Sequence, residues 1–195
     1  MGEATFDVAP TEAVHIALEP TKALASRLFA AIPQWQCTRS EFDGQPVSNE
    51  DLKLLEQAGA GDGITLLLLT ERVAMEKALE YVVRGNTAQM NDPAFVEKLE
   101  AWIRFGDAEA VATGDGLLPR ASGNPSVPRW VGRLLFSALF TTTGENDKYA
   151  KHIRSSAGVA VFVSEADNKA HWVEAGRCYE RFALQATALG IRMRS

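Results

Sequence analysis

The sequence has few of the residues that build metal centres, disulfide frameworks or redox cysteine pairs. Its 195 residues include two cysteines, Cys37 and Cys178, and three histidines that are isolated from one another. Neither a CxxC nor an HExxH element occurs, and the cysteine spacing fits no zinc or redox motif. These absences favour two reduced thiols in a cytoplasmic protein, and they predict no metal site.

An excess of positive charge and long apolar runs are also missing. The formal net charge is −5, which argues against a nucleic-acid partner and against a polybasic membrane partner. The longest apolar stretch, Ile64–Leu69, is far shorter than the roughly 20 residues that span a bilayer. Residues 1–10 carry acids and no apolar core, so they do not read as a secretory signal. We expect residues 1–12 to form a flexible N-terminus.

Motifs of known catalytic chemistry are absent too. The glycines Gly59, Gly61 and Gly63 precede a strand instead of following one, so they predict a turn and not a phosphate-binding loop. No Walker A sequence and no nucleophile elbow around a serine occur. Cys37 with a distant histidine would be a nucleophile pair, but any cysteine and histidine in a chain would qualify equally. The sequence therefore assigns no catalytic residue.

The composition that is present is ordinary for a globular protein, with 46% hydrophobic and 23% charged residues. The length suits one medium domain. A domain near this size buries about 70% of the surface that its unfolded chain exposes, so it needs neither a disulfide nor a metal to fold. We predict a single domain over residues 1–195.

Local patterns predict a few strands and several longer helices. Ile64–Leu69 is continuously apolar, which is typical of a strand buried on both faces, and Ala13–Leu18 and Ala157–Ser164 are further strands. Helices are expected over Lys22–Ile32, Ser48 to about Gln57, Glu71–Gln89, Asp92–Ile103, Trp130–Phe140 and Lys169–Leu189. The mixture indicates an α+β or α/β domain, and the strands are too few and dispersed for repeated βαβ units. We predict an α+β fold.

Helix-end signals support several of these segments. Ser48 with Asp51 has the capping-box pattern, in which the acid reaches back to the cap amide. Asp92 precedes Pro93, which is favoured in a first turn, and Gly190 supplies a C-terminal stop. One face of the last helix is expected to carry Trp172, Gly176, Tyr179, Ala183 and Ala186.

The tryptophans and one long irregular region remain. The four tryptophans are expected to serve core and interface packing, with cofactor stacking as the alternative; they are Trp35, Trp102, Trp130 and Trp172. Residues 106–129 contain four glycines and three prolines. A loop of this length is usually functional or disordered.

Two segments carry a family resemblance when they are taken together. The first is Gln36-Cys37-Thr38-Arg39-Ser40-Glu41-Phe42, continuing through Pro46-Val47 into a helix; the second is the strand 155–162 followed by the helix that ends at 189–191. In this order they are similar to the opening phrase and the closing strand and helix of nitroreductase-family proteins. The residues at 91–95 and 114–117 are most similar to those of the divergent Acg-type branch, whose members resemble two fused nitroreductase halves.

The resemblance implies a mixed sheet flanked by helices and a site for FMN. In the family, the opening phrase binds the flavin phosphate and ribityl chain, which places the cofactor on Gln36, Cys37, Thr38 and Arg39. A guanidinium suits a phosphate because it donates paired, charge-assisted hydrogen bonds. The implied activity is hydride transfer from NAD(P)H through the flavin to a nitro or quinone-type acceptor. The implied partners are the flavin and this small molecule, and a homodimer or self-association.

Departures from the family pattern predict an incomplete copy. Trp35 stands where the family usually has its leading arginine, the Ser/Asn/Gln-Pro-Trp segment is missing after the first helix, and Ser195 falls where flavin-contacting backbone is expected to begin. The alternative function is therefore a non-catalytic flavin-sequestering relative, or a degenerate or truncated one without bound cofactor. In either case the long loop 106–129 is a candidate lid over the flavin.

Overall fold

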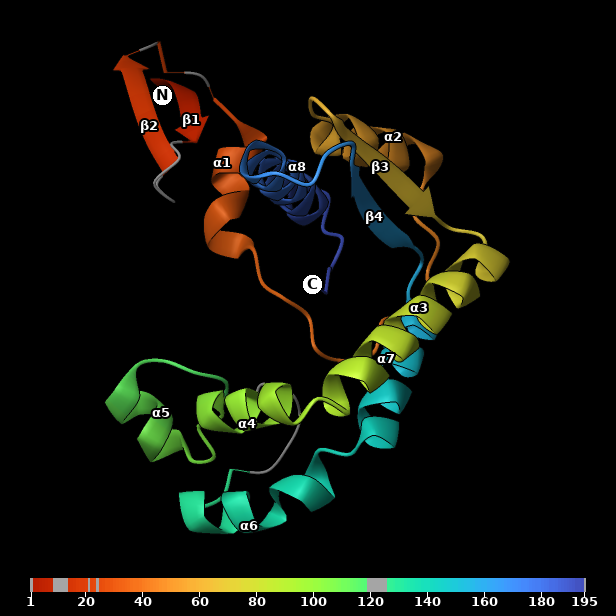
Figure 1. Cartoon of the computed structure of the whole chain (residues 1–195). Helices are drawn as coiled ribbons and strands as arrows, with labels where there is room; N and C mark the ends of the chain where they lie inside the picture. The colour runs from red at the N-terminus through yellow and green to blue at the C-terminus, as the bar shows by residue number, and fades with distance from the viewer. Residues whose placement is uncertain (1, 9–13, 21, 24, 119–125, 195) are drawn as a thin grey trace. The chain divides into compact units, whose positions relative to one another are not determined.

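The described residues of the chain fold into two compact units. The computed structural model describes residues 2–8, 14–20, 22–23, 25–118 and 126–194. Unit 1 comprises Met1–Thr38, Val47–Leu68 and Ala160–Ser195, and unit 2 comprises Arg39–Pro46 and Leu69–Val159. The described chain is mostly helical and adds two small two-stranded sheets (Figure 1), so the fold is α+β, as the sequence predicted. Where the sequence predicted one domain, each unit has a hydrophobic cluster of its own.

Unit 1 is built on the long helix α8 (Lys169–Ala188). Its hydrophobic cluster is centred on Leu55, Phe182 and Ala186, and side chains of the strands Ile64–Leu69 and Val159–Ser164 pack against these three residues. The other elements are β1 (Gly2–Val8), β2 (Val14–Pro20), α1 (Arg27–Ala31), the 3-10 turn η1 (Ile32–Gln34), α2 (Asn49–Gly59), β3 (Ile64–Leu69) and β4 (Val159–Ser164). The helix expected over 22–32 begins later, at Arg27, because Ser26 is its N-cap and its hydroxyl accepts a hydrogen bond from the Phe29 amide.

The N-terminal segment contains a strand that the sequence analysis did not predict. Gly2–Val8 forms β1 and pairs antiparallel with β2, from Gly2 opposite Pro20 to Val8 opposite Val14. Both segments alternate apolar and other residues in sequence, the period of a strand. The acids in this stretch obscured that alternation, and pairing with a partner strand supplies the backbone hydrogen bonds that a lone segment lacks.

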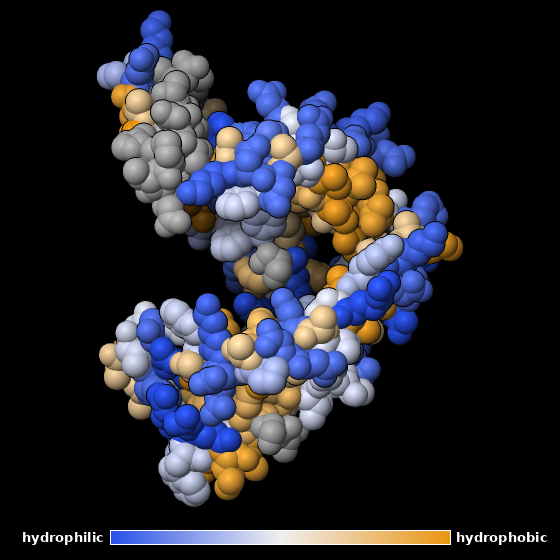
Figure 2. Space-filling view, in the orientation of Figure 1, coloured by the Kyte–Doolittle hydropathy of each residue, from blue (hydrophilic) through white to orange (hydrophobic). Residues whose placement is uncertain are grey.

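The strands β3 and β4 form a second two-stranded sheet. They run antiparallel, because the Glu165 amide donates to the Gly63 carbonyl at 3.0 Å at one end, while Gly158 abuts the Leu69 carbonyl at the other. The expectation that β3 is buried on both faces was wrong. Leu67 is 44% exposed, and Figure 2 shows apolar atoms over this region. An antiparallel sheet can leave one of its faces exposed while the other packs on the core.

Unit 2 contains α3 (Arg72–Met90), α4 (Pro93–Trp102), α5 (Asp107–Thr113), α6 (Arg129–Leu139) and α7 (Thr142–Ser155). Its hydrophobic cluster is made by Ile103, Phe105 and Phe136. Helix α5 occupies part of the region expected to be a long loop, and α7 was not predicted, since most of its residues are polar. Residues 119–125 of that expected loop lie outside the described residues.

Helices α3 and α7 are joined by polar contacts along their length. The Arg154 guanidinium binds Glu76 in a paired contact, at 2.8 Å and 2.9 Å, and the hydrogen bond from Arg154 holds the pKa of the Glu76 carboxyl below its usual range. Farther along, the Asn86 side-chain amide donates to Asn146 Oδ1 at 2.7 Å. These contacts explain how a polar segment becomes helical, since the sequence of α7 alone gives little apolar periodicity.

The helix ends predicted at Ser48, Asp92 and Gly190 are confirmed, whereas the predicted contact of the Asp51 carboxylate with the cap amide is not. Ser48 Oγ accepts from the Asp51 amide at 3.1 Å, although the Asp51 carboxylate binds the Ser48 hydroxyl and not the cap amide. Asp92 accepts from the Ala94 amide, and Gly190 ends α8 with a φ of 75°. A positive φ is readily available only to glycine, so the stop at Gly190 is read correctly from sequence alone.

The predicted role of the tryptophans in core packing was wrong. All four are exposed, from 39% for Trp35 to 73% for Trp130. On α8 the buried residues are Cys178, Phe182, Ala183, Leu184 and Ala186, so the predicted face is covered at Ala183 and Ala186 and exposed at Trp172. Helical periodicity locates an apolar stripe, but the neighbours of the helix decide which part of it is covered.

Candidate functional site

In unit 1, the start of the first segment that carries the family resemblance meets the residues just after the second one. The Thr38 amide donates to the Met193 carbonyl at 2.7 Å, and Cys37 and Met193 form a parallel bridge. The turn after α8 makes this possible, since the Ile191 amide bonds to the Ala186 carbonyl at 2.8 Å and redirects the chain. Residues from opposite ends of the sequence therefore share one backbone pairing.

A cavity of ≈ 180 Å³ lies beside this pairing. It is lined by Gln34, Trp35, Gln36, Thr187, Gly190, Ile191, Arg192 and Met193. The first three come from the end of η1 and the segment after it, and the others from the end of α8 and the turn that follows. The lining combines one guanidinium, two side-chain amides, a hydroxyl and the apolar surface of Trp35 and Met193.

The size and chemistry of the cavity fit one end of a flavin nucleotide. Arg192 offers a fixed positive charge, and Gln34 and Gln36 offer neutral donors and acceptors, which suits a phosphate and a polyol chain. Pockets that enclose a whole drug-sized ligand measure about 300–1,000 Å³. The cavity therefore fits a phosphate with part of its chain, and no described residue of this cavity is placed to enclose the isoalloxazine ring as well.

The structure brings together some of the sequence-predicted site residues. Gln36 lines the cavity and is exposed, while Cys37 and Thr38 are half-buried beside Met193. Arg39 is exposed and belongs to unit 2, so it is not among the lining residues. Arg192 was missed as a site residue. The signal that pointed to it is a basic residue two positions after the helix stop at Gly190.

A second polar cluster in unit 1 surrounds Cys178. The Cys178 thiol is fully buried and donates to Glu174 Oε1 at 3.7 Å, while Arg181 Nη2 lies 3.3 Å from the sulfur. Burial raises the pKa of this thiol above its usual range, and the nearby Arg181 only partly offsets that effect. Because the thiolate is the nucleophilic form, Cys178 is a packed, protonated thiol and not a nucleophile.

In the same cluster, Arg181 caps the C-terminal end of α2. Its guanidinium donates from Nε to the Ala58 carbonyl at 3.1 Å and from Nη2 to the Ala60 carbonyl at 2.6 Å. These carbonyls have no partner within the helix, and a cation there also offsets the negative end of the helix dipole. Arg181 thus fixes the turn that connects α2 to β3.

We expect Arg181→Leu to lower the free energy of unfolding by about 1–1.5 kcal/mol. The variant loses the hydrogen bonds to the Ala58 and Ala60 carbonyls, and water can partly replace them. The side chain is 33% exposed, so the loss stays below that of a buried charge. Chemical denaturation monitored by circular dichroism measures it. Arg177→Leu, on the same helix, is the control, and an equal loss in both variants would contradict the capping role.

Comparisons with known proteins supply no relative. No protein-family model matches the chain, and neither a curated protein nor a solved structure matches it. Among the described residues, no helix is both long and apolar enough to cross a membrane. Within those same ranges, no group of three or more His, Cys, Asp or Glu side chains is placed to bind a metal ion.

Proposed function

We propose that this chain is an FMN-binding protein of the nitroreductase-like, Acg-type class. The observation that carries the proposal is the pairing of Thr38 with Met193, because it brings the first segment of the resemblance to the turn that follows the second one, beside the cavity. The proposal includes a cytoplasmic location, a small-molecule acceptor and a self-associating chain.

The residues of this cavity would hold the phosphate end of the cofactor. Arg192 would neutralise the phosphate, and the side-chain amides of Gln34 and Gln36 would bind the ribityl hydroxyls. When bound, FMN supplies hydride transfer from a nicotinamide to a nitro or quinone-type acceptor, while the protein binds and orients it. This is the activity of an oxidoreductase of the proposed class.

The size of the cavity favours a second candidate, a non-catalytic flavin-sequestering protein. At ≈ 180 Å³ the cavity accommodates the phosphate end of the cofactor and not the isoalloxazine ring, on which the hydride transfer takes place. A protein that holds the phosphate end without building a site around the ring would store or withhold a flavin. The lid expected at 106–129 belongs to unit 2 and stays a prediction.

A ligand pair tests the proposed site. Purified protein is titrated with FMN and, separately, with riboflavin, which lacks the phosphate, and quenching of flavin fluorescence measures each affinity. We expect Arg192→Gln to weaken FMN binding about tenfold, which corresponds to about 1.4 kcal/mol, because one charge-assisted phosphate contact is lost. Riboflavin affinity should stay unchanged, and Arg84→Gln, an exposed arginine of unit 2, should behave as the unmodified protein.

The outcomes separate the two candidates. Bleaching of the bound flavin by NADH or NADPH supports the oxidoreductase. A bound flavin that is reduced by neither nucleotide supports the sequestering protein. A colourless protein that binds neither flavin contradicts both. If FMN binds but Arg192→Gln has no effect, the flavin site lies elsewhere in the chain.

A further inference from the structure

Thr187, in the last turn of α8, contributes a hydroxyl to the cavity, and the proton of this hydroxyl is already used within the helix. Its Oγ1 donates to the Ala183 carbonyl at 2.9 Å. Ala183 has no exposed surface, so water does not compete for this carbonyl. A hydroxyl has one proton to donate and two lone pairs that accept. Thr187 therefore offers the cavity an acceptor and no donor.

Gln34, which lines the same cavity, is held in a similar way. Its Nε2 donates to the Ala30 carbonyl at 3.2 Å. One of its two amide protons is thus used within the chain, and Oε1 is left to accept from a ligand. Two neutral side chains of the cavity, one from each of the segments that form it, therefore present acceptor oxygens.

The end of α8 adds partial negative charge on the Thr187 side of the cavity. The helix ends at Ala188, and Gly190, with a φ of 75°, redirects the chain. The carboxyl end of a helix carries roughly half an elementary negative charge, which favours cations and hydrogen-bond donors and disfavours anions. The positive charge of the cavity comes from Arg192, beyond this turn. A phosphate would therefore lie at Arg192, and a group that donates hydrogen bonds would lie at Thr187.

We propose that Thr187 determines the specificity of this cavity for a phosphorylated polyol, by accepting a hydrogen bond from a hydroxyl of the polyol chain. The inference rests on the proposed flavin site, and it names the part of FMN that α8 recognises, the ribityl chain. A carbonyl or carboxylate at the same place in a ligand would set its lone pairs against those of Thr187 Oγ1. An oxidised chain is therefore disfavoured by repulsion as well as by a missing contact.

Ligands without the flavin ring test this contact by isothermal titration calorimetry. They are ribitol 5-phosphate, which has the chain and the phosphate of FMN, and inorganic phosphate, and FMN itself is the third ligand. Thr187→Val keeps the shape of the side chain and removes the hydroxyl. We expect it to weaken the binding of ribitol 5-phosphate and of FMN about fivefold each, the value of one hydrogen bond between neutral groups. The affinity for inorganic phosphate should stay unchanged.

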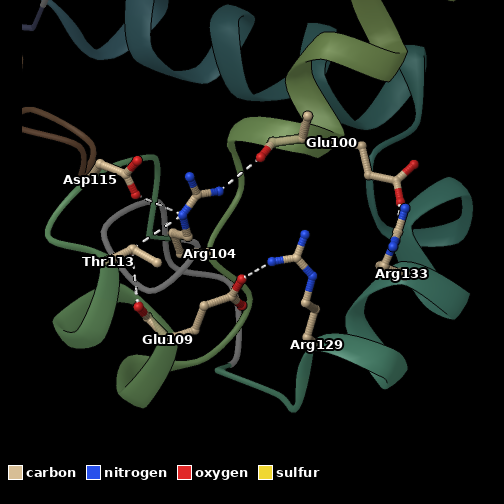
Figure 3. A network of polar contacts seen from close by, with 8 residues as sticks. Glu100, Arg104, Glu109, Thr113, Asp115, Arg129 and Arg133 are labelled. Carbon is tan, nitrogen blue, oxygen red and sulfur yellow. Dashed lines mark hydrogen bonds and ion pairs between the residues drawn. The ribbon is translucent and has the colours of Figure 1, made fainter.

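Two further variants serve as controls. Thr187→Ser keeps the hydroxyl and should bind all three ligands like the unmodified protein. Thr113 of α5 makes the same contact four residues back along a helix, since its Oγ1 donates to the Glu109 carbonyl at 3.0 Å (Figure 3). It is not among the residues that line the cavity, so Thr113→Val should leave all three affinities unchanged. Circular dichroism checks that each variant is folded.

The other outcomes separate this inference from the proposed function. If Thr187→Val binds ribitol 5-phosphate and FMN like the unmodified protein, the inference is overturned and the flavin site stands. If this variant also binds inorganic phosphate more weakly, Thr187 shapes the cavity and does not recognise the chain, which overturns the inference too. Binding of ribitol 5-phosphate without binding of FMN overturns the proposed function and leaves the contact with Thr187 standing. A protein that binds none of the three ligands overturns both.

Discussion

Replacing Phe182 by alanine is expected to lower the free energy of unfolding of unit 1 by about 3–5 kcal/mol, the cost of deleting a buried aromatic ring. Phe182 is 5% exposed and meets the Phe162 ring of β4 edge-on, with centroids 5.7 Å apart. It also packs in one cluster with Leu55 of α2. One side chain thus links helix α2, strand β4 and the long helix α8, and its removal leaves a cavity whose lining loses these contacts.

A loss of this size is a large part of the total stability of a domain, which is about 5–15 kcal/mol. Guanidinium denaturation followed by circular dichroism measures it. Trp172→Ala is the matched control, because it removes a larger ring from the same helix at a position 58% exposed, and it should cost less than about 1 kcal/mol. Equal losses in the two variants would mean that Phe182 is not the centre of this core.

Replacing Gly132 by alanine is expected to destabilise unit 2 by about 2–3 kcal/mol, near the upper end for overpacking a core. A Cβ at this position would stand 2.2 Å from a Phe105 ring carbon and 2.7 Å from its Cβ. Phe105 is 3% exposed and is held edge-on by Phe136, so the ring has no space to move into. The gain in helix propensity, about 1 kcal/mol for alanine over glycine, offsets only part of this clash.

Gly85→Ala in α3 is the control for that prediction. It lies within a helix of the same unit, and no atom stands within 4 Å of its added Cβ. This change should therefore stabilise the protein by up to about 1 kcal/mol through helix propensity. The two alanines thus have opposite signs, and a neutral or stabilising Gly132→Ala would show that α6 does not pack closely on Phe105. Thermal unfolding of both variants distinguishes these results.

Of the residues that the resemblance assigned to the cofactor, Gln36 lines the cavity, and Cys37 and Thr38 follow it in the chain. Their partner Met193 and the lining residue Arg192 come from the other end of the chain, and no local pattern records such a pairing. Arg39, the residue assigned the phosphate on resemblance, is exposed and lies in unit 2.

The sequence by itself determined the features whose interactions close within a few residues. These include the cap at Ser48, the start of α4 at Asp92, the glycine stop at Gly190 and the strand Ile64–Leu69. Side-chain caps, a positive φ and β-branched or apolar runs act over one helical turn or one strand, so they can be read from neighbouring letters.

Only the tertiary structure decided which surfaces are covered. It made a helix of the polar segment 142–155 by packing it on α3, left the four tryptophans exposed, and paired Thr38 with Met193. The burial of a side chain depends on which distant segments of the chain pack against it. The free energy gained by this burial exceeds the weak local propensities that can be read from the sequence.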